Sequence, residues 1–187
     1  MARVSWTSDD DAIGLADMSE HHAVGFPPVS SPEARILILG SLPGVRSLSQ
    51  VEYYAQPQNA FWRIMGEVYG AGPERTYPER LQRLVAQRVA LWDVVQAGIR
   101  PGSLDSAIVR SSIEVNDFVA FLGSHPRIEL ICFNGRTAAD LYTRRVLPSL
   151  PAQARRIAMR TLPSTSPAFA TMRFKDKLRH WAEALTV

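Results

Sequence analysis

At 187 residues, 46% of them hydrophobic, the chain suits one domain with one sizeable core, and its net charge of +3 follows an acidic start of five acidic side chains and one basic in residues 1–32. No apolar run reaches the roughly 20 residues needed to span a bilayer, and the N-terminus has no apolar signal core, so we expect a cytoplasmic protein without a membrane segment. Cys132 is the only cysteine, which excludes an intrachain disulfide and argues against a cysteine-ligated zinc or iron–sulfur centre.

Residues 1–30 show no periodicity and are expected to form a flexible arm ahead of a single α/β domain at 31–187. In that domain, strand and helix signals alternate. The expected strands span 35–39, 89–95, 128–133 and 156–161, and the first of them is an apolar run. The expected helices span about 60–69, 78–86, 116–123, 136–146 and 172–185. This alternation predicts a three-layer sandwich, in which helices cover both faces of a mostly parallel sheet of about four strands.

Short motifs rich in glycine, proline, aromatic and carboxamide residues follow the expected strands. They are Gly40-Ser-Leu-Pro-Gly44, Tyr53-Tyr-Ala-Gln-Pro-Gln-Asn59-Ala-Phe-Trp62, Phe133-Asn-Gly135 and Leu162-Pro-Ser-Thr-Ser-Pro167. Right-handed crossovers place the carboxyl ends of parallel strands along one edge, so one crevice can collect all these segments. Rings and carboxamides together suit the binding of a flat heterocycle, such as a base flipped out of a duplex.

In this order, the motifs resemble the uracil-DNA glycosylase superfamily, and within it the branch of DNA-deoxyinosine (hypoxanthine-DNA) glycosylases. The resemblance spans roughly residues 25 to 185. It implies a monofunctional enzyme that needs neither metal nor other cofactor and releases hypoxanthine from deoxyinosine in DNA. It also implies a monomer whose partner is DNA containing deaminated bases.

The resemblance assigns catalysis to Asn59. In the mismatch-specific branch, the asparagine that positions water lies within the Gly-x-x-Pro-Gly motif, where this chain has Leu42, a side chain that cannot orient water. The role therefore moves to Asn59, whose carboxamide would align the attacking water. Asn59 also precedes an expected helix and is a good N-cap residue, and the two roles can coexist.

Three residues of the first two motifs are expected to contact the base: Ser41, Leu42 and Tyr54. Tyr54 stands where superfamily members place an aromatic ring that stacks on the flipped base, although a tyrosine taken alone is more often part of a core. Ser41 could offer its hydroxyl or backbone N–H to the base edge, or could simply form the turn.

Two further residues are expected at the base edge. Asn134 ends an expected strand and could present a donor and an acceptor to hypoxanthine, or could only close a turn. Asp93 stands where classical uracil enzymes have a base-reading asparagine. Burial beside a partner such as Arg100 is an equal alternative for this carboxylate.

DNA phosphates are expected to meet Ser164, Thr165 and Ser166 together with Arg160 and Lys175. From residue 33 onward the chain has 20 basic against 13 acidic side chains, which favours a polyanionic partner. The densest basic group surrounds the last motif and consists of Arg155, Arg156, Arg160, Arg173, Lys175, Lys177 and Arg179. A compositional bias or a plain solvated surface would explain the same charges.

Three alternatives stay open. The near one is a uracil or mismatch glycosylase that uses the same pocket, although Leu162 replaces the histidine that assists uracil departure in classical uracil enzymes. The alternative of another class is a non-catalytic module that binds damaged or single-stranded DNA, in which Asn59 only caps a helix. A small-nucleotide hydrolase would not require the basic group.

Overall fold

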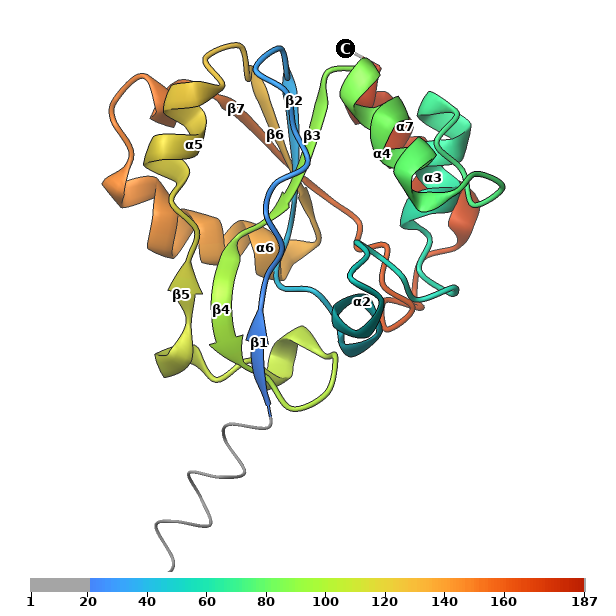
Figure 1. The fold of residues 1–187 in the computed structure, drawn as a ribbon, viewed down its shortest axis with the longest axis horizontal. Coiled ribbons are helices and arrows are strands. Elements are labelled where there is room, and N and C mark those ends of the chain that lie inside the picture. The colour runs from blue at the N-terminus through green and yellow to red at the C-terminus, as the bar shows by residue number, and fades with distance from the viewer. Residues whose placement is uncertain (1–20, 187) are drawn as a thin grey trace, which may run out of the picture.

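The computed structural model describes residues 21–186 (Figure 1). Its strands are β1 (His22–Val24), β2 (Ile36–Gly40), β3 (Val89–Asp93), β4 (Val95–Ile99), β5 (Glu114–Val115), β6 (Leu130–Asn134) and β7 (Ala158–Leu162). Its α-helices are α2 (Val45–Gln50), α3 (Phe61–Tyr69), α4 (Tyr77–Ala86), α5 (Phe118–Ser124), α6 (Arg136–Leu141) and α7 (Phe174–Leu185). Among the described residues, no helix is both long and apolar enough to cross a membrane.

The central element is a four-stranded sheet in the order β3-β2-β6-β7, with every neighbouring pair parallel. Helices α3, α4 and α7 lie on one side of this sheet, and α5 and α6 lie on the other (Figure 1). The predicted three-layer sandwich is therefore confirmed. Because all four strands run the same way, Gly40, Asp93, Asn134 and Leu162 end them at one edge.

Strand β2 has every residue buried, and its alternate side chains supply two cores. Ile36 and Ile38 pack in the cluster that contains Phe61 of α3 and Trp181 of α7. Leu37 and Leu39 pack in the opposite cluster, built from aromatic residues of α5, β6 and the turn after α6. Both faces of β2 are thus covered, which explains why this strand is a continuous apolar run in the sequence, whereas the edge strand β7 is exposed along most of its length.

Local sequence features explain the formation of helices α3 and α4. Helix α3 buries Phe61, Trp62, Ile64 and Met65 on one face and ends at a left-handed glycine, Gly70, with φ 66°. Helix α4 begins with a capping box, in which Thr76 and Glu79 bond each other's backbone N–H, and has a proline in its first turn.

A second, antiparallel sheet in the order β1-β4-β5 was not predicted. The expected strand 89–95 is in fact two strands, because the chain leaves the parallel sheet at Val94 and enters the antiparallel one at Val95. Residues 1–20 of the expected arm lie outside the described residues. Residues 22–24, also assigned to that arm, form β1 and pair with β4, so the folded body begins before residue 31. A three-residue strand is too short to leave a periodic signal.

Candidate active site

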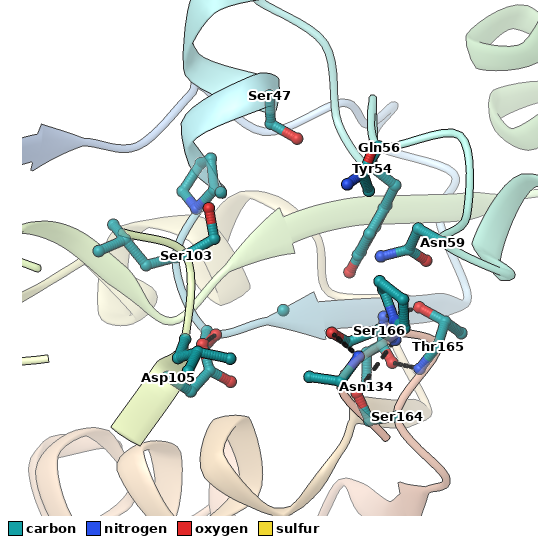
Figure 2. Close-up of a pocket in the computed structure, with 18 of the residues that line it drawn as sticks. Ser47, Tyr54, Gln56, Asn59, Ser103, Asp105, Asn134, Ser164, Thr165 and Ser166 are labelled. Carbon is teal, nitrogen blue, oxygen red and sulfur yellow. Dashed lines mark hydrogen bonds between the residues drawn. The ribbon is translucent and has the colours of Figure 1, made fainter. Parts of the chain in front are cut away.

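A cavity of about 440 Å³ opens at the carboxyl edge of the parallel sheet (Figure 2). Its volume lies in the range of about 300–1,000 Å³ typical of small-molecule sites. Nine of the residues predicted for the site line it: Ser41, Leu42, Tyr54, Asn59, Asp93, Asn134, Ser164, Thr165 and Ser166. The topology therefore brings the sequence motifs together as expected.

Tyr54 is held in an unusual backbone conformation at the wall of this cavity. Its φ is 55°, in the left-handed region that costs a non-glycine residue free energy and is often found at functional sites. Its ring stacks on Phe61, with centroids 3.9 Å apart and planes 22° apart. Its hydroxyl is buried and makes no hydrogen bond of standard geometry among the described residues. Burial raises the pKa of the phenol, an effect that the nearby Asn134 carboxamide partly opposes. Since Phe61 covers one face of the ring, a base can stack only on the other.

Asn59 makes a structural contact and also lines the cavity. Its Oδ1 accepts a hydrogen bond of 3.0 Å from the backbone N–H of Phe61, at the start of α3. The next residue, Ala60, occupies the N-cap position and donates its backbone N–H to the carbonyl of Thr165 at 2.9 Å. In Figure 2 the Nδ2 of Asn59 points toward Tyr54, and the Oδ1 of Asn59 points away from it. One lone pair of Oδ1 and the hydrogens of Nδ2 are left for a water molecule or for DNA.

Asn134 clamps the loop that follows β7. Its Nδ2 donates to Oγ1 of Thr165 and its Oδ1 accepts from the backbone N–H of Thr165, both at 2.8 Å. Thr165 is only 1% exposed, so the structure gives it a different task from the predicted phosphate contact. Gly135, with φ 97°, allows this approach, because a Cβ there would lie 3.0 Å from that of Ser164. The predicted base-reading role of Asn134 is left with only the remaining hydrogen and lone pair of its carboxamide.

Ser41 and Leu42 line the cavity, and their side chains also contact other parts of the protein. The Ser41 hydroxyl donates a hydrogen bond of 2.6 Å to Oδ1 of Asp105, a residue that the sequence did not single out. The Leu42 side chain is 6% exposed and packs in a small apolar cluster with Val95 and Ile108. Leu42 therefore holds the motif loop in place, which agrees with its having no part in orienting water.

Beneath that loop lies a buried charge cluster that sequence reasoning missed in part. Arg100, 3% exposed, donates to the carbonyl oxygens of Leu42, Pro43 and Gly102. Asp93 is 4% exposed, so the predicted alternative of a buried carboxylate is correct in that respect. Within residues 21–186, however, Asp93 makes no ion pair with Arg100. Burial and the charge of Asp105 raise the pKa of Asp93 to about 7, against the opposing effect of Arg100. Residues 100–105 show no helical or strand periodicity in the sequence. Only the charged side chains of Arg100 and Asp105 could have indicated that this loop belongs to the site.

The predicted phosphate-binding cations lie outside the cavity. Arg160 on β7 and Lys175 on α7 are exposed, whereas Lys177 is 5% exposed. The Lys177 ammonium donates to the carbonyl oxygen of Phe169 at 2.8 Å and lies 5.1 Å from the centre of that ring. Lys177 thus supports the exposed Phe169, at the rim of the cavity.

The fold is a three-layer α/β sandwich, and a cavity lined by aromatic and carboxamide side chains lies at the carboxyl edge of its parallel sheet. The chain belongs to the uracil DNA glycosylase superfamily, whose family model matches residues 27–186.

Two curated relatives are hypoxanthine DNA glycosylases. The one from Methanosarcina acetivorans is 41% identical over 143 residues, which cover 72% of this chain and 89% of the relative. The one from Methanosarcina barkeri is 39% identical over 117 residues, which cover 62% of this chain and 73% of the relative. A solution NMR structure of a Methanosarcina acetivorans protein, described as a uracil DNA glycosylase, superposes with a TM-score of 0.72 at 35% identity. That match covers 88% of this chain and 96% of the other.

Proposed function

We propose that this protein is a monofunctional DNA glycosylase that hydrolyses the N-glycosidic bond of deoxyinosine in DNA and releases hypoxanthine. The observation that carries the proposal is the stacked pair Tyr54–Phe61 beside the carboxamide of Asn59, in one cavity at the sheet edge. The two curated relatives, 41% and 39% identical, support hypoxanthine as the base.

In the proposed reaction, the flipped hypoxanthine stacks on the free face of Tyr54. Stacking of this kind contributes about 1–3 kcal/mol per base. Asn59 holds a water molecule against the anomeric carbon, which develops positive charge as the bond to the base breaks. The hydrogen bond from the N–H of Phe61 holds the carboxamide of Asn59 in one orientation, so the water is positioned before the reaction begins.

The proposed DNA surface lies around the loop after β7. Ser164 and Ser166 line the cavity and are the hydroxyl candidates for phosphate oxygens, and the exposed Arg160 and Lys175 are the charged ones. The partner is DNA containing deaminated bases. We also propose that the protein acts as a monomer and in the cytoplasm.

Single-turnover excision from labelled duplexes, each with one inosine, uracil or xanthine, tests this function. We expect hypoxanthine to be released fastest. Faster release of uracil would make the protein a uracil glycosylase with the same pocket. Tight binding to all three duplexes without release of any base would support the non-catalytic alternative.

A further inference from the structure

The carboxyl group of Asp93 occupies the floor of the cavity, where β2 and β3 end. A Cβ on Gly40 would collide with Oδ1 of Asp93 and would lie 3.0 Å from the hydroxyl oxygen of Tyr54. The carboxyl and the phenol therefore converge on one point at the strand end. Both residues line the cavity, and Oδ2 of Asp93 is buried with no hydrogen-bond partner in the described part of the chain.

The charges around this carboxyl do not balance if every group is ionised. Asp93 and Asp105 interact electrostatically with each other and with one guanidinium, that of Arg100. A buried charge without compensation is costly, and two close carboxylates disfavour ionising both. One proton shared by the two carboxyl groups makes the cluster neutral.

The contacts decide which carboxyl group carries that proton. Burial raises the pKa of Asp105 too, but a hydrogen bond of 2.6 Å from Ser41 and the charge of Arg100 both favour its ionised form. Oδ2 of Asp93 accepts no hydrogen bond within the described residues, and Arg100 alone opposes the rise of its pKa. The pKa of Asp93 near 7, raised by burial and then by Asp105, agrees with this assignment. The other titratable groups that face Asp93 are the phenols of Tyr53, Tyr54 and Tyr77, whose pKa values are raised, so they stay neutral.

A purine leaves the sugar with the electron pair of the glycosidic bond, and a proton donated to the ring stabilises it. Among the described residues, no histidine, lysine or cysteine lines the cavity. The strand end at β7 offers only the buried apolar side chain of Leu162. Asp93 is thus the acid placed to supply a proton, since an acid works best when its pKa is near the working pH.

We propose that Asp93 is the general acid of the reaction and that ionised Asp105 is the positioning residue that keeps it protonated. The inference rests on the proposed function. As the bond between C1′ and N9 breaks, its electron pair passes to the purine and the Asp93 proton moves to a ring nitrogen. The oxygen of water bonds to C1′ and releases a proton to solvent, and Asp93 takes one up again from solvent.

The test is the rate of single-turnover hypoxanthine release between pH 5.5 and 9 for three proteins. The wild-type rate should fall above about pH 7, where Asp93 loses its proton. Asp93→Asn keeps the size of the side chain and a hydrogen-bond donor but cannot transfer a proton. Its rate at pH 6 should be lower by about a hundredfold or more, and the alkaline fall should disappear.

Asp105→Asn removes the negative charge that raises the pKa of Asp93, so the alkaline fall should move to lower pH. A purely structural role for Asp105 would lower the rate equally at every pH. Melting temperatures, and binding to a duplex with an uncleavable abasic analogue, confirm that each variant is folded and binds DNA.

An Asp93→Asn protein that keeps the wild-type rate, or keeps the alkaline fall, overturns the inference. So does an Asp105→Asn protein whose profile is only scaled down. A wild-type protein that releases no hypoxanthine at any pH overturns the proposed function, and the inference with it, which is a different result from a variant with the wrong profile.

Discussion

Replacing Asn59 by alanine separates its contact with α3 from its proposed contact with water. The hydrogen bond of 3.0 Å from the N–H of Phe61 to Oδ1 of Asn59 is lost, and loss of one such hydrogen bond costs about 1 kcal/mol of unfolding free energy. For a chain of this size that corresponds to roughly 2–4 °C in melting temperature. Loss of a positioned catalytic group should lower single-turnover hypoxanthine release by roughly 10²- to 10⁴-fold.

The matched control is Asp117→Ala. Asp117 caps α5 by accepting a hydrogen bond of 3.0 Å from the N–H of Ala120, and it does not line the cavity. Its loss should lower the melting temperature by a similar amount and leave base release almost unchanged. An Asn59→Ala protein that behaves like this control, destabilised but active, would refute the catalytic assignment.

Three further outcomes are expected. Tyr54→Phe should keep most activity, since the buried hydroxyl makes no hydrogen bond of standard geometry in the described structure. Tyr54→Ala should lose about 1–3 kcal/mol of transition-state stabilisation, because the stacking ring is removed. Equal losses of kcat/KM in the two variants would show that the phenol hydroxyl matters. Combining Arg160→Ala with Lys175→Ala should weaken binding equally on all duplexes and lower the salt slope by about 2, which a titration at several salt concentrations checks; an unchanged slope places the DNA elsewhere. Asn134→Ala should lower the unfolding free energy by about 1–3 kcal/mol in urea, because it leaves Thr165 unpaired; an unchanged value would show that the clamp contributes little.

The parallel sheet could be predicted because its three buried strands are mostly apolar and alternate with segments of helical periodicity. The same property concealed the break at Val94. The run 89–95 is apolar except for Asp93, and where the chain changes sheets the N–H groups of Val94 and Val95 donate to the carbonyls of Gly40 and Ser41. Such a contact joins segments more than 50 residues apart, so no local pattern contains it.

The site divides in the same way. Residues at strand ends or in the segments that follow them, such as Asn134, Tyr54 and Asn59, could be placed in one crevice, because parallel strands must end at one edge. The hydrogen-bond partners of the site residues could not be predicted from the sequence. The bond from Ser41 to Asp105 joins residues 64 apart, and the clamp from Asn134 to Thr165 joins residues 31 apart. Tertiary packing alone decides which carboxamide or hydroxyl is already engaged within the protein.

The hydrogen bond from the N–H of Ala60 to the carbonyl of Thr165 connects the loop after β7 to the start of α3. Thr165 belongs to the loop proposed to meet the DNA backbone, and Ala60 follows the residue proposed to hold water. A displacement of the loop is therefore transmitted to the start of α3. Replacing the loop after β7 to change DNA affinity should therefore also shift Asn59 and change the rate of base release. DNA affinity and catalytic rate cannot be altered separately through this loop.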